Sequence, residues 1–389
     1  MFTHSAAGCP DSGTTVRKSR KIRIFPDADQ RALLRRWFGV SRFVYNRTVA
    51  YLQQPGTKAD WKGIKTGLLH SLPDWCADVP YLVKSIAIRD ACIAVREAKR
   101  RYRETGKVHE VKFRSRKSPV QSIFIPATAI KDRGLYPTLL GDLRYAEPLP
   151  SPVKDSRLVL RDGRYHLHVS TAAPVQQVEN QGRIVALDPG VRTFQTFYAE
   201  EAVGQFGDRA CGRIQRLCQH LDNLLSQADA APHRRKRNLY RAASRIRRRI
   251  RNLVDELHHQ VAHWLVRHYD IILLPDFRVQ GMSGRAGRNI RRKTVRNLLT
   301  LSHYRFKAFL LHKAAEFGKQ VVIVNEAYTS KTCSWSGEVI PNLGGRKVVT
   351  GSDGVSLDRD INGARGIFLR ALVDTPWLQN CLQPASRAP

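Results

Sequence analysis

The segment Ile-Val-Ala-Leu-Asp-Pro-Gly at residues 184–190 decides the fold of the C-terminal half of this 389-residue chain. Four consecutive apolar residues bounded by a Pro-Gly turn predict a buried strand. Asp188 ends this strand, and a carboxylate is costly to bury unless a cation compensates its charge. The segment therefore predicts a strand that ends in a candidate metal ligand. An acid that simply opens a Pro-Gly turn is the structural alternative.

Two other acids of the C-terminal half stand in similar settings. Glu326 ends an apolar run, and Asp360 lies at the start of a predicted helix. A two-metal site that cleaves phosphodiester bonds needs hard oxygen ligands around cations about 4 Å apart. Asp188, Glu326 and Asp360 are therefore candidate catalytic residues and Mg2+ ligands. Helix capping by Asp358 or Asp360 is the structural alternative.

The C-terminal half predicts alternating strands and helices in the order β-β-α-β-α-β-α. Together with acids at strand ends, this order favours an α/β fold of the ribonuclease H type. The predicted strands cover residues 183–188, 194–198, 271–274 and 320–326, and the predicted helices cover residues 210–268, 293–317 and 359–372. We therefore expect an α+β multidomain protein.

The N-terminal half predicts one strand, several helices and then short strands. Residues 20–25 alternate charged and apolar side chains, as a half-buried strand does. Asp27 predicts a helix start, a second helix is expected around residues 43–46, and a long basic helix over 80–104 ends at Gly106. The later strands include residues 111–114, residues 122–125 and a hairpin that turns at Asp162-Gly163. This pattern favours a β-barrel that is closed by the first strand and carries the helices as an insertion.

The charge composition indicates a polyanionic partner. Lys and Arg total 66 and Asp and Glu total 33, so the formal net charge is +33. A field of this sign attracts nucleic acid, although a ribosomal-type basic protein is a simpler alternative. Residues 233–251 contain no acid, whereas a solvated helix face normally mixes both signs. We expect phosphate-backbone contacts at Arg234, Arg235, Lys236, Arg237, Arg245, Arg248, Arg249, Arg291, Arg292 and Lys293.

The cysteine count and the apolar runs bear on location. Seven widely spaced cysteines do not suggest a disulfide framework, which favours a reducing compartment. The first residues lack the apolar core of a signal peptide, and no apolar run reaches roughly 18 residues. The sequence predicts a soluble intracellular protein with no membrane partner.

Three sequence blocks carry a family resemblance. They are residues 186–194 (Ala-Leu-Asp-Pro-Gly-Val-Arg-Thr-Phe), 328–333 (Tyr-Thr-Ser-Lys-Thr-Cys) and 358–364 (Asp-Arg-Asp-Ile-Asn-Gly-Ala). They resemble the RuvC-type nuclease motifs of TnpB proteins, which are transposon-encoded RNA-guided DNA endonucleases related to type V CRISPR effectors. The detail is most similar to their eukaryotic and viral relatives, the Fanzor proteins. Residues 21–26 also resemble the opening of the family.

One departure from the TnpB pattern concerns the middle motif. Pro275 stands where the family has a Glu. Fanzor proteins lack this Glu and use one elsewhere, so the resemblance implies that Glu326 replaces it. Asp276 is the rival ligand, although neighbouring strand residues point to opposite faces. A third alternative is that neither acid serves and the enzyme is inactive.

A second departure concerns the four-cysteine zinc ribbon that the family usually carries. Cys333 is the one thiol left of the first Cys-x-x-Cys pair, and the second pair falls at Thr350 and Asp353. One cysteine cannot complete a tetrahedral structural zinc site. We therefore expect no bound zinc and a loop that is held by packing.

The resemblance implies an RNA-guided DNA endonuclease that uses two Mg2+ at a single RuvC-like site. The implied partners are a guide noncoding RNA and target double-stranded DNA, bound by a monomeric ribonucleoprotein in the nucleus. A nuclease-dead RNA-guided DNA-binding protein is the alternative. The expected parts are a disordered tail (1–18), a wedge-like barrel (19–27 and 106–178), a helical recognition insertion (28–105), the nuclease domain (183–330 and 358–374), a degenerate zinc-ribbon-like nucleic-acid-binding insertion (331–357) and a flexible tail (375–389).

Overall fold

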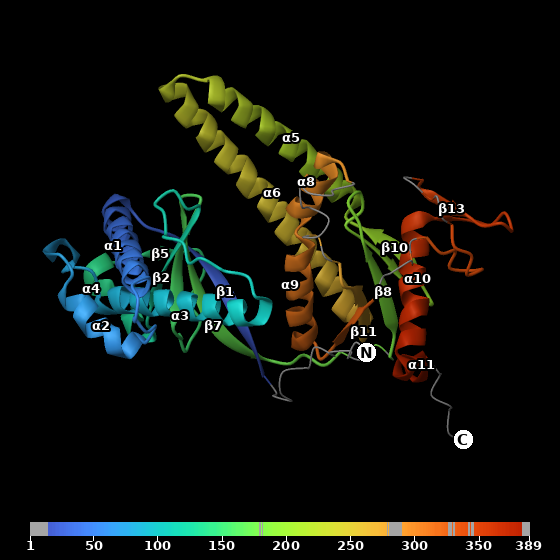
Figure 1. Cartoon of the computed structure of the whole chain (residues 1–389), viewed down its shortest axis with the longest axis horizontal. Helices are drawn as coiled ribbons and strands as arrows, with labels where there is room; N and C mark the ends of the chain where they lie inside the picture. The colour runs from blue at the N-terminus through green and yellow to red at the C-terminus, as the bar shows by residue number, and fades with distance from the viewer. Residues whose placement is uncertain are drawn as a thin grey trace. The chain divides into compact units, whose positions relative to one another are not determined.

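In the computed structural model the chain divides into two compact units, residues 17–173 and the residues from 174 onward. Each unit contains its own five-stranded sheet (Figure 1). The structure describes residues 15–178, 180, 182–277, 279, 290–325, 329, 331–340, 343 and 346–382. None of the helices in these ranges is long and apolar enough to cross a membrane.

The N-terminal unit is built on a sheet with the strand order β2-β6-β7-β1-β5. Its strands are β1 (Thr15–Phe25), β2 (Val120–Ile125), β5 (Arg144–Tyr145), β6 (Ser156–Arg161) and β7 (Arg164–Pro174). The predicted hairpin of β6 and β7 is confirmed: Asp162 and Gly163 have φ of 50° and 73°, as a two-residue turn requires. β1 begins at Thr15, so residues 15–18 are not part of the disordered tail expected over residues 1–18, and the rest of that tail lies outside the described residues.

The expected closure of this sheet into a barrel is not observed. Within the described residues the sheet has β2 at one edge and β5 at the other, so it is open. β5 is two residues long and pairs with β1 only at Ile24 and Phe25. Such a short strand cannot extend the ladder around to β2. The remaining short elements of this unit are β3 (Ile130–Lys131), β4 (Gly134–Leu135), α4 (Pro137–Leu140) and two turns of 3-10 helix at Asp74–Cys76 and Ala127–Ala129.

Three longer helices complete this unit: α1 (Ala28–Leu52), α2 (Trp61–His70) and α3 (Tyr81–Thr105). Asp27 begins α1 in a capping box with Gln30, and Gly106 ends α3 with a left-handed φ of 67°, both as predicted. The separate helix expected around residues 43–46 is wrong, because the buried positions of α1 continue without a break to Val49.

One hydrophobic core joins these helices to the sheet. Trp37 of α1 and Ile88 of α3 are fully buried in the same cluster as Leu158 and Leu167 of the sheet. The apolar faces of the helices and of the sheet therefore cover one another.

The strand expected over residues 111–114 is wrong, and this stretch is irregular. Asn46 of α1 holds it in place. The Asn46 amide group donates to the Arg114 carbonyl at 3.0 Å, and its carbonyl oxygen accepts from the Arg114 N–H at 2.7 Å. One side chain thus satisfies the backbone groups that a neighbouring strand would otherwise pair.

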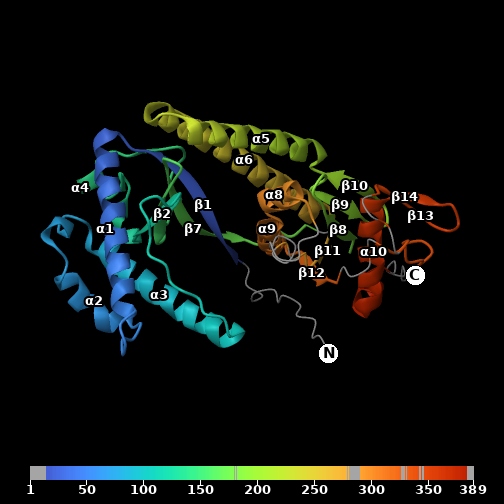
Figure 2. The same cartoon turned by 45° about the horizontal axis from the view of Figure 1, so that its top comes forward.

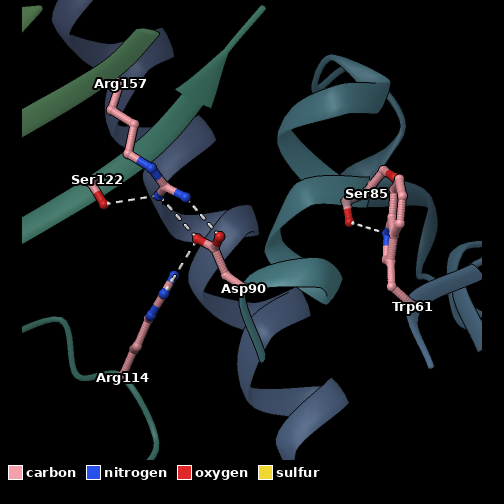
Figure 3. Close-up of polar contacts among 6 residues, drawn as sticks. All are labelled: Trp61, Ser85, Asp90, Arg114, Ser122 and Arg157. Atoms are coloured by element: carbon pink, nitrogen blue, oxygen red, sulfur yellow. Dashed lines mark hydrogen bonds and ion pairs between the residues drawn. The ribbon is translucent and has the colours of Figure 1, made fainter. Parts of the chain in front are cut away.

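Asp90 of α3 joins three segments of this unit (Figure 3). Its side chain is only 12% exposed, and Arg157 of β6 donates to both carboxylate oxygens, at 2.7 and 3.0 Å. Arg114 lies 3.5 Å from the same carboxylate. Nearby, the Trp61 indole N–H donates to the Ser85 carbonyl at 3.0 Å and ties α2 to α3.

The sheet of the C-terminal unit has the strand order β10-β9-β8-β11-β12. β8, β11 and β12 are parallel, and β9 and β10 run antiparallel to their neighbours. The strands are β8 (Ile184–Pro189), β9 (Gln195–Tyr198), β10 (Val203–Phe206), β11 (Ile271–Pro275) and β12 (Gln320–Val324), and a separate hairpin contains β13 (Val348–Thr350) and β14 (Ser356–Asp358). The alternation of strands and helices follows the predicted order, except that β10 adds a strand that was not predicted.

The described helices of this unit are α5 (Asp208–Ala230), α6 (His233–His268), α8 (Arg292–Leu301), α9 (His303–Glu316), α10 (Arg359–Asp374) and α11 (Pro376–Leu382). The helical stretch expected over 210–268 consists of two helices, α5 and α6, which form a hairpin because Pro232 lacks the N–H that a continuous helix needs. This hairpin extends away from the sheet in both views (Figures 1 and 2). The helix expected over 293–317 is also two helices, which meet at Ser302 with a left-handed φ of 54°.

Helices cover both faces of this sheet. Alternate strand residues, such as Ala186 and Leu273, pack against Phe368 of α10. The intervening residues, such as Leu187, pack in a second cluster with Phe306 of α9. Residues from 375 onward were expected to form a flexible tail, but α11 occupies part of this stretch. Its Leu378 is fully buried in the cluster that contains Ala186, Leu273 and Phe368.

We expect Asp90→Ala to lower the midpoint of thermal unfolding of the full chain. Removing one partner of a mostly buried ion pair leaves two arginines without their carboxylate and costs about 3 kcal/mol. The matched control is Glu147→Ala, which removes the half-exposed partner of Arg20 and should cost about 1 kcal/mol or less. Equal losses for the two variants in differential scanning calorimetry would contradict this role of Asp90.

Candidate active site

Asp188 lies at the carboxyl end of β8, opposite Thr196 of β9. The chain then turns, and the Gly190 N–H donates to the Phe194 carbonyl at 3.3 Å. A Cβ at position 190 would lie only 2.5 Å from the Thr193 carbonyl oxygen, so glycine is required for this close approach. The turn predicted after Asp188 therefore has a defined geometry.

α10 brings Asp360 to the face of the sheet on which Asp188 lies. The Asp188 carboxylate contacts α10 at Gly363, where an added Cβ would lie 2.6 Å from Asp188 Oδ2 and 3.3 Å from Cγ. Gly363 follows Asp360 by three residues, so the two share one side of the helix. The structure thus places the Asp188 carboxylate within one helical turn of Asp360. Glycine at position 363 is the residue that allows this contact.

Asp358, rather than Asp360, caps α10. The Asp358 Oδ1 accepts hydrogen bonds from the N–H groups of Asp360 at 2.9 Å and Ile361 at 3.3 Å. The structure therefore assigns capping, the alternative role for these acids, to Asp358.

The environment of Asp360 disfavours its ionised form. Burial raises the pKa of the Asp360 carboxyl above its usual value, and the negative charge of Asp358 raises it further. The positive charges of Arg359, Arg192 and Lys347 act in the opposite direction. A buried acid beside a second acid gains stability from a bound cation.

Pro275 is the last residue of β11, the strand next to β8. The parallel ladder between these strands ends where Leu273 pairs with Ala186, and extending this register by two residues would bring Pro275 level with Asp188. On its other side Pro275 pairs with Val324, the last residue of β12. A carboxylate at position 275 would therefore stand beside Asp188. Glu326 follows β12 and lies outside the described residues.

Asp276 faces the other side of the sheet. Its carboxylate forms an ion pair with Lys307 of α9 at 3.3 Å, and α9 packs on the face opposite α10. Asp276 and Lys307 line a cavity of about 600 Å³ on that face, together with Pro189, Gln195, Leu274, Pro275, Phe277, Val279, His303, Tyr304 and Phe306. Asp276 is thus separated from Asp188 and Asp360 by the sheet itself.

A stack of rings supports the Asp188 turn from the same side as α9. The Phe194 ring lies between His258 and His303, with centroids 5.1 and 5.2 Å away, and Phe306 packs edge-on at 5.0 Å. Burial lowers the pKa of both histidines to about 4, so they are neutral at physiological pH. His258 is a packing residue. His303 was not singled out, since no local pattern marks a contact between distant segments.

Asn362 attaches the segment at residues 331–340, which follows β12 in the chain, to α10. Sequence reasoning did not assign it this role. Its carbonyl oxygen accepts from the Ser334 N–H at 2.9 Å, and its amide group donates to the Thr332 carbonyl at 2.9 Å. Asn362 is fully buried. The available signal was an asparagine next to Gly363 in a predicted helix. A polar side chain that becomes buried there needs hydrogen-bond partners.

The segment at 331–357 has its own small core. Cys333 is fully buried with Leu343 and Val349. Thr350 and Asp353 stand at the positions of the second cysteine pair of the zinc ribbon, and both have hydrogen-bond partners. Asp353 Oδ2 accepts from the Trp335 indole N–H at 2.9 Å, and Thr350 Oγ1 lies 2.8 Å from the Ser356 hydroxyl. Burial raises the pKa of the Cys333 thiol. One neutral thiol, a hydroxyl and an engaged carboxylate do not fit a structural zinc site.

The two basic clusters lie at helix starts. Arg234–Arg237 begins α6 beside the hairpin turn, and Arg291–Lys293 begins α8. Most of these side chains are exposed, as are Arg245 and Arg249, whereas Lys236 and Arg248 are half-buried. Positive charge at a helix N-terminus opposes the helix dipole, so helix stability does not account for these clusters.

Two protein families match parts of the chain. The Cas12f1-like TNB domain family matches residues 303–367. A helix-turn-helix domain family matches residues 15–55, where the structure has β1 followed by the single helix α1.

Relatives that match most of this chain include viral and bacterial proteins. A TnpB-like protein of Acanthamoeba polyphaga mimivirus is 27% identical over 389 residues, covering 92% of this chain and 74% of the relative. InsQ of Escherichia coli (strain K12), named as a candidate RNA-guided DNA endonuclease, is 25% identical over 371 residues, covering 90% of each chain. The solved structure of a Cas12f1–sgRNA–target DNA complex superposes with a TM-score of 0.51 at 10% identity, covering 91% of this chain and 99% of that chain, which shows a shared fold.

We expect Asp360→Asn to raise the midpoint of thermal unfolding at neutral pH in EDTA. A raised pKa means that the ionised carboxylate is less favourable in the folded than in the unfolded protein, so its charge lowers stability above that pKa. Asparagine removes this charge. The gain in the unfolding midpoint should vanish at a pH well below the usual Asp pKa, because the wild-type carboxyl is then protonated in both the folded and the unfolded protein.

Mg2+ should stabilise the wild type but not Asp360→Asn. Asp374→Asn, at the half-exposed end of α10, is the control and should leave the Mg2+ response intact. A variant that is less stable than wild type in EDTA would contradict the role assigned to burial.

Proposed function

Because the chain belongs to the TnpB-like proteins, we propose that it is an RNA-guided DNA endonuclease that hydrolyses phosphodiester bonds at a single RuvC-like site. The observation that carries the proposal is the contact of the Asp188 carboxylate with Gly363, one helical turn from Asp360. It unites acids from two of the nuclease-like sequence blocks.

The proposed cofactor is a pair of Mg2+ ions held by Asp188, Glu326 and Asp360. The described acids fit such ions, since both offer hard carboxylate oxygens and the raised pKa of Asp360 reflects a charge that a cation would compensate. When bound, two Mg2+ activate water and neutralise charge on the leaving 3′ oxygen. The chain contributes the fixed position of its acids, one on a strand and one on a helix.

Glu326 is proposed as the third acid because of the sheet geometry around Pro275. Extending the register between β8 and β11 would bring Pro275 level with Asp188, but Pro275 carries no carboxylate. Asp276 is engaged by Lys307 on the other face. Val324 pairs with Pro275, and Glu326 follows it by two residues, the interval after which strand side chains point to the same face.

The proposed partners are a guide noncoding RNA and target double-stranded DNA. Phosphates of these strands would neutralise the exposed basic starts of α6 and α8, which helix electrostatics disfavours. Base pairing with the guide would supply the sequence specificity. We propose that the particle is a monomeric ribonucleoprotein, located in the nucleus as the Fanzor resemblance implies.

A nuclease-dead RNA-guided DNA-binding protein is the second candidate. The observation that favours it is Pro275, which removes a carboxylate from the position level with Asp188. The two functions differ only in whether bound DNA is cut.

We expect the full-length chain, purified with its bound RNA, to cut matching DNA in Mg2+. Asp188→Ala, Asp360→Ala and Glu326→Ala should each lower the cleavage rate by more than about 100-fold, since even outer-shell changes at metal sites cost 10–100-fold. Asp276→Ala is the matched control and should stay active, because this acid lies on the other face. An active Glu326→Ala variant would refute the ligand assignment. A wild type that binds but does not cut would establish the nuclease-dead function.

We also propose that the segment at 331–357 folds without zinc. Metal analysis of protein purified from zinc-containing medium should find no stoichiometric zinc, and EDTA should not lower its thermal midpoint. Val349→Ala should lower this midpoint by removing buried volume from the small core around Cys333. One zinc ion per chain would overturn this proposal.

A further inference from the structure

The N-terminal unit carries a charged cluster that the proposed nuclease site does not use. We call it the Asp90 patch, defined as Asp90 together with Arg42, Arg114, Arg116 and Arg157. Its members come from α1, α3, β6 and the irregular stretch after α3. Figure 3 shows Arg114 and Arg157 converging on Asp90 from two directions.

Arg114 is immobilised but accessible. Its guanidinium lies 3.7 Å from the centre of the Tyr45 ring and 3.5 Å from the Asp90 carboxylate. Asn46 binds its backbone N–H and carbonyl groups. The side chain nevertheless remains 36% exposed. A guanidinium held in this way loses little conformational entropy when it binds a ligand.

Arg42 and Arg116 lie at the side of this cluster. Arg42 donates to the Gln121 side-chain oxygen at 2.9 Å, and the Gln121 amide group donates to the backbone carbonyl of Arg116 at 3.2 Å. Burial lowers the pKa of Arg42, and the positive charge of Arg116 lowers it further. Two like charges therefore lie near each other, which is unfavourable unless an anion compensates them.

The Asp90 patch has more positive charge than its acid neutralises. Four arginines contribute +4 and Asp90 contributes −1, which leaves a formal charge of +3. Arg157 already occupies both oxygens of Asp90. An ion pair that serves only the fold would need one arginine, whereas here Arg114 adds charge that the carboxylate does not balance. Exposed guanidiniums in a fixed arrangement match the oxygens of phosphate groups.

We propose that the Asp90 patch binds consecutive backbone phosphates of the guide RNA. This inference rests on the proposed function, in which the RNA strand stays bound while DNA targets come and go. A site that is already rigid in the free protein suits such a lasting partner, because ordering costs little. Phosphate contacts of this kind position a strand without reading its sequence.

The test measures binding of co-purified RNA to the RNA-stripped full-length chain over a range of salt concentrations. Arg114→Gln should weaken binding and reduce the slope of log affinity against log salt by about 0.7, the value for one phosphate contact on a single strand. Arg114→Lys keeps the charge and should retain the slope. Arg133→Gln removes one highly exposed guanidinium elsewhere in the same unit and should leave it unchanged. Thermal unfolding of each variant separates lost folding from lost binding.

Three results would overturn the proposal. One is an equal salt slope for Arg114→Gln and Arg133→Gln while the wild type still cleaves DNA. This result would refute RNA binding by the Asp90 patch and leave the proposed function intact. Another uses two further ligands, oligothymidine DNA and oligouridine RNA of equal length. If Arg114→Gln lowers the affinity for the DNA but not for the RNA, the patch binds DNA. The third is a wild-type chain with no affinity for RNA, which removes the proposed function as well.

Discussion

The contact between the Asp188 carboxylate and Gly363 is the constraint on which the C-terminal unit depends. α10 can approach β8 closely only because position 363 has no side chain, and this approach lets Phe368 bury against Ala186 and Leu273. A glycine inside a helix costs about 1 kcal/mol relative to alanine, which the packing of α10 offsets. The same contact places Asp360 one helical turn from the Asp188 carboxylate. The close approach of α10 to β8 therefore forms both the core and the candidate site.

The alternation of side chains in the sheet decides which acids can share this site. Residues facing α10 follow one parity along β8 and β11, and Asp276 has the other parity. Its ion pair with Lys307 therefore belongs to the α9 side. Pro275 has the right parity but no carboxylate. In the proposed site a third ligand on the α10 side would come from a neighbouring strand, and β12 pairs with β11 at Pro275.

Local signals in the sequence predicted much of the fold. The capping box at Asp27, the glycine at 106 and the hairpin turn at Asp162-Gly163 depend on neighbouring residues only, and the structure has all three. The helix break at Ser302 has no such mark, because a left-handed φ is uncommon for a residue other than glycine. Asn46 likewise prevents a strand at 111–114 through a contact between distant segments. Of the candidate site, the strand-end position of Asp188 was predictable, whereas its contact with α10 required the fold.

The positive charge of the chain is arranged against local stability at three places. The starts of α6 and α8 carry basic residues where the helix dipole disfavours them by about 0.3–1 kcal/mol each. In the Asp90 patch, Arg42 and Arg116 are held close although their charges repel. Features that break a local rule without benefit to the fold are expected at functional sites. A bound polyanion would relieve the unfavourable charge at each of these places, and in the proposed function that polyanion is nucleic acid.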